Sequence, residues 1–198
     1  VGTERATQVL QDGQQITVSC AEGAVGKVYR GALAFEKTSV ELSELPTTRT
    51  KMMLNVGNPH GALALSFLPH NGVGLARMEF IITNAIGIHP LALLDFDTLP
   101  SEVKDQIAGL TGGYLDKSKF FVDKLSEGIG TIAAAFYPHD VIVRFSDFKT
   151  NEYADLIGGK QYEPREENPV PGVRRPARYY HPAYERAFAP EGRAIPVV

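Results

Sequence analysis

Two arginines, each next to an apolar stretch, are the residues of this sequence best suited to hold an anion. Arg77 lies in the run 72–82, GVGLARMEFII, and Arg144 follows the first three residues of the run 141–148, VIVRFSDF. Both runs predict buried strands. A guanidinium is always charged, and its planar fork donates two parallel hydrogen bonds to a carboxylate or phosphate. We therefore predict that Arg77 and Arg144 clamp an anion.

The alternative for each arginine is an ordinary ion pair with a nearby carboxylate. Glu79 lies two residues after Arg77, and on a continuous strand the two side chains would share a face. Asp147 and Glu152 follow Arg144 and are its candidate partners. For either arginine taken alone, the sequence leaves the ion pair and the anion clamp both open.

Composition excludes several classes of protein. The 198 residues are 43% hydrophobic and 9% aromatic, which is enough to bury a core in one or two domains. Basic and acidic residues are interspersed with a net charge of -3, so we expect neither a nucleic-acid partner nor a membrane partner. No apolar run approaches the length of a membrane span, and the first residues lack a signal-peptide pattern.

Cysteine and histidine provide no predicted reactive centre. Cys20 is the single cysteine, so an internal disulfide is excluded and a reducing cytoplasm fits best. It ends a β-type run, where we expect an ordinary semi-buried thiol. The five histidines show no metal-ligand spacing and are expected in surface loops; they are His60, His70, His89, His139 and His181.

The pattern of apolar and polar residues changes twice along the chain. Residues 1–36 contain three short β-type runs, 16–20, 26–29 and 32–35, separated by glycines. Residues 37–50 are polar and predict a linker. From Lys51 onward, strands are predicted near 52–56, 75–82 and 141–145, with helices at 61–67, 101–110 and 115–136. Ser101 is the predicted N-cap of the second helix.

Strands that alternate with helices and are apolar on both faces predict a parallel α/β sheet. Functional residues at strand ends favour a (β/α) barrel of the TIM type, with an open sheet as the second choice. Only three or four strands are present, whereas a closed barrel needs eight. We therefore expect a partial barrel with an open edge and marginal stability.

Six motifs occur in one order along the sequence. They are GQQITVSCAEG at 13–23, KMMLNVGNP at 51–59, the run 72–82, IGIHP at 86–90, the stretch 141–153, and EPREENP at 163–169. Together they resemble the phosphoenolpyruvate synthase (pyruvate, water dikinase) family of PEP-utilising enzymes. The motif SDFKTNEY at 146–153 favours this family over pyruvate, phosphate dikinase and the sugar phosphotransferase Enzyme I.

The resemblance implies a reaction and an assignment for each region. The family converts ATP, pyruvate and water to AMP, phosphoenolpyruvate and phosphate with Mg²⁺, and a swivelling domain carries the phosphohistidine. Residues 1–36 resemble the end of that swivelling domain, and residues 51–198 resemble the N-terminal part of the PEP/pyruvate-binding barrel. Arg77 and Arg144 match family arginines that hold the carboxylate and phosphoryl oxygens of the substrate.

The resemblance also implies what this sequence lacks. The phosphohistidine, the ATP-binding domain, the Mg²⁺ ligands and the catalytic cysteine of the family match nothing here. We thus expect a fragment with no catalytic residue, inactive alone, from a cytoplasmic homo-oligomer. The alternative is a non-catalytic anion-binding or assembly module derived from the same enzymes.

The tail after Pro169 departs from the family pattern. Arg174 still matches a family arginine, but two prolines interrupt the strand expected from Val170 onward. Pro190 and Pro196 should interrupt the next helix. The run 174–180, RRPARYY, mixes bases with aromatics, and we predict a solvated irregular tail rather than a nucleic-acid patch.

Overall fold

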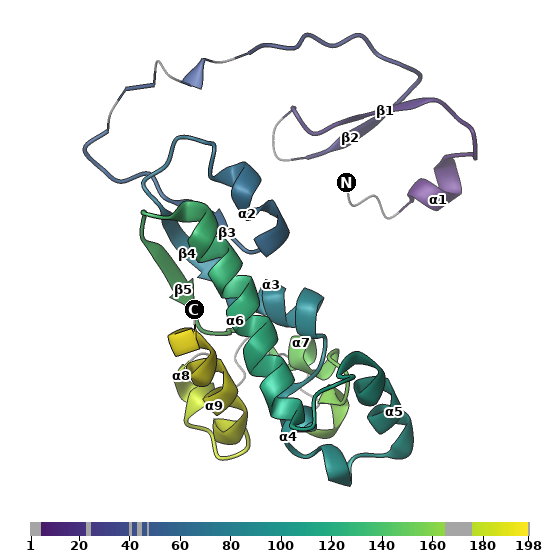
Figure 1. Ribbon diagram of the computed structural model, residues 1–198. Helices are drawn as coiled ribbons and strands as arrows, with labels where there is room; N and C mark the ends of the chain where they lie inside the picture. The colour runs from purple at the N-terminus through teal and green to yellow at the C-terminus, as the bar shows by residue number, and fades with distance from the viewer. Residues whose placement is uncertain are drawn as a thin grey trace. The chain divides into compact units, whose positions relative to one another are not determined.

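The computed structural model describes residues 5–22, 25–39, 41–42, 45–46, 48–164 and 176–197 (Figure 1). The chain forms two compact units, Val1–Leu45 and Pro46–Val198, which are described separately. The division lies within the range 37–50 that the sequence predicts as a linker. The assignment of the first unit to a swivelling domain stays a prediction.

Among its described residues, the first unit contains one short helix and one hairpin. Helix α1 spans Ala6–Val9, and strands β1 (Ile16–Ser19) and β2 (Lys27–Arg30) pair antiparallel. The third predicted β run, 32–35, is not a strand. Cys20 follows β1 directly and is exposed, so the expectation of a semi-buried thiol was wrong. Among the described elements, β1 and β2 have their main contacts with each other, so no other element buries Cys20.

The second unit is built on a parallel sheet, as the alternating pattern predicts. Strands β3 (Leu54–Val56), β4 (Val73–Arg77) and β5 (Val141–Arg144) lie in the order β3-β4-β5. Both strand pairs are parallel, which confirms the α/β class. Among the described strands β4 alone has neighbours on both sides, so β3 and β5 are the two edges.

The apolar run 72–82 divides into a strand and a helix instead of one strand. β4 ends at Arg77, and helix α3 (Met78–Ile81) begins at the next residue. Buried side chains in this part recur at helical spacing, at Met78, Ile81 and Ile82. A continuous apolar run does not by itself distinguish a buried strand from a buried helix. Glu79 therefore does not share a strand face with Arg77.

Helix α6 (Lys117–Phe136) is the main support of the sheet and confirms the predicted long helix. It contacts β4, β5 and the helices α2 (Pro59–Leu65), α4 (Pro90–Leu94) and α9 (Glu185–Ala194), and Figure 1 shows it running the length of this unit. Asp116 caps it by accepting a hydrogen bond from the Ser118 N–H at 2.9 Å. The remaining elements of this part are η2 (Ile82–Ile86), η3 (Phe96–Thr98), α5 (Ser101–Leu110), α7 (Thr150–Ala154) and η4 (Gly159–Gln161).

Ser101 is not the cap of α5. Pro100 occupies the N-cap position, and no side chain caps this helix. Ser101 is the first helical residue, so its hydroxyl lies one position too late to act as the cap.

The C-terminal segment is helical and packed, contrary to the prediction of a solvated irregular tail. Helices α8 (Pro176–Tyr179) and α9 (Glu185–Ala194) are followed by η5 (Ile195–Val197). Pro190 lies inside α9 and does not end it. One missing backbone hydrogen bond is tolerated because this part of α9 is buried and α9 packs on α6. The divergent stretch 170–175, with Arg174, lies outside the described residues.

A glycine in α6 allows close packing that an alanine would disturb. A Cβ at Gly128 would lie 2.8 Å from Cγ2 of the buried Ile81, whereas a Cβ at Gly109 in α5 would meet nothing within 4 Å. We expect Gly128→Ala to lower the free energy of unfolding by about 1–2 kcal/mol, because overpacking outweighs the gain in helix propensity. Gly109→Ala should raise it by about 0.5–1 kcal/mol. Urea unfolding of both variants checks this, and equal shifts would contradict it.

Candidate functional site

Arg77 and Arg144 lie side by side at the carboxyl edge of the sheet. They are register partners, each the last residue of its strand, on β4 and β5. Neighbouring strands are about 4.8 Å apart, so the two backbones hold both side chains within reach of one small ligand. Both arginines line a cavity of about 700 Å³. The sequence prediction that these arginines belong together agrees with this geometry, and their role in binding stays a prediction.

The Arg77 guanidinium is available for a ligand. In the described part of the chain it forms no ion pair, and its Cζ lies 4.6 Å from the centre of the Phe80 ring. This cation–π contact orients the group without neutralising it. The sequence left open an ion pair between Arg77 and Glu79, but this pair is not formed. Glu79 lies in α3 and pairs with Arg144 instead.

Arg144 is held by two carboxylates. Its Nη2 is hydrogen-bonded to Glu79 Oε1, and its Nη1 lies 3.9 Å from Asp147 Oδ2. Glu79 Oε1 also accepts a hydrogen bond from the Asp147 backbone N–H at 3.0 Å. Glu79 thus joins the end of β5 to α3, and the pairing of Arg144 with Asp147 that the sequence left open is present. Since 42% of the Arg144 side chain is exposed, the guanidinium still reaches the cavity.

The rest of the cavity wall comes from two segments that follow the strands. One is η2, which contributes Thr83 and Asn84 and is followed by Gly87, whose φ of 69° favours glycine. The other is the segment 147–156, which contributes Lys149 and three carboxylates. The ammonium of Lys149 forms no ion pair within the described residues, so it is a third cation on the wall. The sequence analysis missed it, although it lies only five residues after Arg144.

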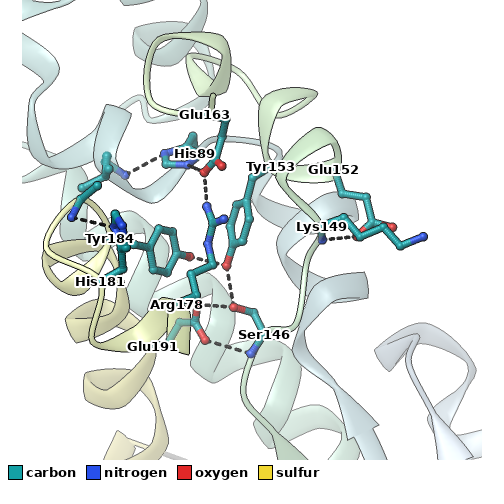
Figure 2. A network of polar contacts seen from close by, with 12 residues as sticks. His89, Ser146, Lys149, Glu152, Tyr153, Glu163, Arg178, His181, Tyr184 and Glu191 are labelled. Carbon is teal, nitrogen blue, oxygen red and sulfur yellow. Dashed lines mark hydrogen bonds and ion pairs between the residues drawn. The ribbon is translucent and has the colours of Figure 1, made fainter. Parts of the chain in front are cut away.

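A buried hydrogen-bond network lies next to this cavity and holds Ser146, which directly precedes Asp147 in the loop after β5 (Figure 2). Ser146 donates from its N–H to Glu191 Oε2 at 3.1 Å and from Oγ to Glu191 Oε1 at 2.6 Å. Its Oγ is also 2.7 Å from the hydroxyl of Tyr153, which in turn accepts a hydrogen bond from Tyr184. Burial raises the pKa of Glu191 to about 7, although the Ser146 bonds oppose this shift.

The same network contains a buried ion pair. Arg178 is paired with Glu163, and its Cζ lies 4.1 Å from the Tyr153 ring centre and 4.3 Å from that of Tyr184. Only 6% of Arg178 is exposed. This arginine belongs to the run predicted to be solvated, and its contacts with Glu163 and with the two tyrosine rings accompany its burial.

His89 is fully buried, so its expected place in a surface loop was wrong. Its Nδ1 accepts a hydrogen bond from the Leu91 N–H at 3.2 Å, so the proton of the neutral ring lies on Nε2. Nε2 is 3.1 Å from Glu163 Oε1 and donates to it. Burial lowers the pKa of His89, and Glu163 partly opposes that shift. The ring therefore acts as a neutral N-cap of α4 and as a donor to Glu163, roles that a single sequence does not reveal.

Metal binding and membrane insertion have no support in the part of the chain that the structure describes. No group of three or more histidine, cysteine, aspartate or glutamate residues there could hold a metal ion. None of the helices described combines the length and the apolar character that crossing a membrane requires.

Comparisons with known proteins identify the family of the chain. Residues 34–197 match the family described as "PEP-utilising enzyme, PEP-binding domain". The chain is 52% identical over 195 residues to a phosphoenolpyruvate synthase of Pseudomonas aeruginosa (strain UCBPP-PA14), and 53% identical over 195 residues to one of Deinococcus radiodurans. It is 48% identical over 195 residues to one of Escherichia coli (strain K12).

Each of these matches includes 98% of this chain and 25% of the relative. The chain thus spans about a quarter of the length of the curated relatives it matches. The family match extends over most of the sequence, including both arginines and the whole parallel sheet. The chain belongs to the PEP-utilising enzyme family, and its residues 34–197 match the PEP-binding domain of that family.

Proposed function

We propose that the cavity beside Arg77 and Arg144 binds phosphoenolpyruvate and pyruvate, as part of a phosphoenolpyruvate synthase. The overall reaction would convert ATP, pyruvate and water to AMP, phosphoenolpyruvate and phosphate. The single observation that carries the proposal is the pairing of two arginines at the carboxyl edge of parallel strands, on a wall of a cavity of about 700 Å³. The family match and the names of the relatives support it.

The chemistry of the ligand explains why two guanidinium groups are useful here. Phosphoenolpyruvate carries a carboxylate and a phosphoryl group, and each accepts paired hydrogen bonds from an arginine fork. Transfer of a phosphoryl group depends mainly on positioning and on stabilisation of its spread negative charge. In this proposal the phosphoryl group comes from a phosphohistidine, and Arg77 and Arg144 orient the carboxylate and phosphoryl oxygens. Arg77 has the greater free charge, because Arg144 is shared with Glu79 and Asp147.

The wider assignment follows the same family. We propose that β3, β4 and β5 are strands of a (β/α) barrel of the TIM type and that residues 1–36 belong to a swivelling phosphohistidine domain. The Mg²⁺ that the family implies does not fit the described residues alone, since no suitable ligand group is present among them. No step proposed for this chain therefore depends on the metal. An ATP-binding domain, a homo-oligomer and a cytoplasmic location stay predictions.

Exchange of Arg144 for lysine tests the proposal. Lysine keeps the charge but loses the two-pronged donor geometry, so Arg144→Lys should weaken phosphoenolpyruvate binding by about 1.5–3 kcal/mol. The neutral amide pyruvamide should lose much less affinity. Calorimetric titration of the 198-residue chain with both ligands measures the difference.

Arg186→Lys is the matched control, because Arg186 pairs with Asp95 and does not line the cavity. It should leave both affinities unchanged. Equal losses for the two ligands in Arg144→Lys would indicate a structural arginine. Absence of phosphoenolpyruvate binding to the unmodified chain at millimolar concentration would contradict the proposed function itself.

A further inference from the structure

Ser146 connects the cavity wall to the C-terminal helices through all of its polar groups. Its N–H and its Oγ both donate to Glu191, and its carbonyl oxygen accepts a hydrogen bond from the Tyr179 hydroxyl at 2.8 Å. Ser146 lies two residues after Arg144 and directly before Asp147, whose own N–H is bound by Glu79. The loop after β5 is therefore held between α3 on one side and α8 and α9 on the other.

Glu191 is an unusual residue for its position. It is fully buried in α9, and both of its carboxylate oxygens bind Ser146, 45 positions earlier in the sequence. No cation pairs with it among the described residues, and a buried carboxylate without a cation is costly. Ser146 presents two donors, and only a carboxylate offers an accepting oxygen to each. A glutamine would turn an N–H₂ group toward one of these donors.

We propose that Glu191 is a positioning residue of the anion-binding cavity, acting through Ser146 to fix the loop that follows Arg144 and carries Asp147. Helix α9 is then part of the site although it contributes no residue to the cavity wall. The ligand used below rests on the proposed function, whereas the positioning of the loop can be measured without it.

The charges around Glu191 give the proposal a pH dependence. The groups that face it are Tyr153 from α7, Tyr179 from α8, Tyr184 before α9, and Glu79 from α3. Burial raises the pKa of all three tyrosines, so Glu191, with its pKa of about 7, is the group of this network that changes charge near neutral pH. The ionised carboxylate accepts both Ser146 donors, and protonation replaces one acceptor with a donor. The loop should therefore be held most firmly above pH 7.

Three variants separate positioning from general stability. Ser146→Ala removes the Oγ bond, Glu191→Gln keeps the shape of the side chain but removes its charge, and Ser126→Ala is the control. Ser126 is also buried, and its Oγ donates to the Ala194 carbonyl of the same helix α9 at 2.8 Å. The control therefore removes a bond between α9 and the core without touching the loop.

Two measurements on the 198-residue chain test whether Glu191 positions the loop: hydrogen exchange and ligand calorimetry. Hydrogen exchange, followed by mass spectrometry at pH 8, should be at least tenfold faster in residues 144–149 in Ser146→Ala and Glu191→Gln, but unchanged there in Ser126→Ala. Calorimetry should show at least tenfold weaker phosphoenolpyruvate binding in the first two variants and less than a twofold change in the control. The affinity of the unmodified protein relative to that of Glu191→Gln should rise from pH 6 to pH 8, because titration of the ligand phosphate is common to both.

Each outcome bears on one proposal. Unchanged exchange of residues 144–149 in Ser146→Ala overturns the positioning role, whatever happens in Glu191→Gln, which has the greater risk of unfolding. Equal effects of Ser146→Ala and Ser126→Ala on exchange and on affinity also overturn it. If the unmodified chain fails to bind phosphoenolpyruvate while exchange of the loop increases as expected, the proposed function fails and the positioning role stands.

Discussion

Replacement of Arg178 with methionine should lower the free energy of unfolding by about 3–5 kcal/mol, because it leaves a buried carboxylate without its cation. Arg178 is 6% exposed, and its partner Glu163 retains only 3% of its side-chain exposure. Methionine has a similar length and keeps apolar contact with the rings of Tyr153 and Tyr184. The loss therefore reports mainly the unpaired charge. Urea unfolding followed by circular dichroism measures it.

An exposed arginine provides the control. Arg186 pairs with Asp95 at 2.7 Å, but 64% of its side chain is exposed. Arg186→Met should thus cost less than about 1 kcal/mol. The double variant Arg178→Met/Glu163→Gln should recover much of the loss, since it removes the stranded charge and still offers His89 an acceptor. Equal losses in the two single variants would show that the Arg178 pair has no special role in stability.

The second large effect is the loss, as the pH rises from 5 to 8, of the contribution that Glu191 makes to the free energy of unfolding. The pKa of Glu191 is raised from 4.5 to about 7 in the folded protein, so between these values the folded state binds more protons than the unfolded state. The free energy of unfolding then decreases with pH, and the shift of 7 - 4.5 units corresponds to about 3 kcal/mol. The contribution of Glu191 is complete below pH 4.5 and lost above pH 7.

Glu191→Gln isolates this effect from other titrations. His89 acts in the opposite direction, because its lowered pKa means that the unfolded state takes up a proton first as the pH falls. The comparison at each pH is therefore the unmodified protein minus Glu191→Gln, and this difference should fall by about 3 kcal/mol between pH 5 and pH 8. A constant difference across that range would show that Glu191 does not titrate there.

Local patterns predicted the elements that carry the two arginines. Apolar side chains at helical spacing predicted α6, and a short run of β-branched residues predicted β5 with Arg144 at its end. The run 72–82 was harder because it is apolar throughout, so nothing in it marks the change from β4 to α3 at Met78. Strand ends were therefore predictable where polar residues follow at once, and not where a buried helix continues the apolar run.

The C-terminal segment shows why sequence rules failed elsewhere. The bases and tyrosines of the run 174–180 predicted an irregular, solvated tail, and Pro190 predicted an interrupted helix. Burial of Arg178 and Glu191 instead depends on α6 and on the residues that follow β5, which lie far away in the sequence. A local propensity is a weak determinant when tertiary packing compensates one missing hydrogen bond.

The sequence by itself determined the α/β class, the long helix and the two arginines of the candidate site. These depend on residue type and on spacing within about twenty positions, which fix the backbone locally. Only the tertiary structure decided that Glu79 binds Arg144, 65 positions away, and that Glu191 binds Ser146, 45 positions away. Such pairings follow from how the helices pack on the sheet, and no local pattern encodes the distance between two side chains that meet only after folding.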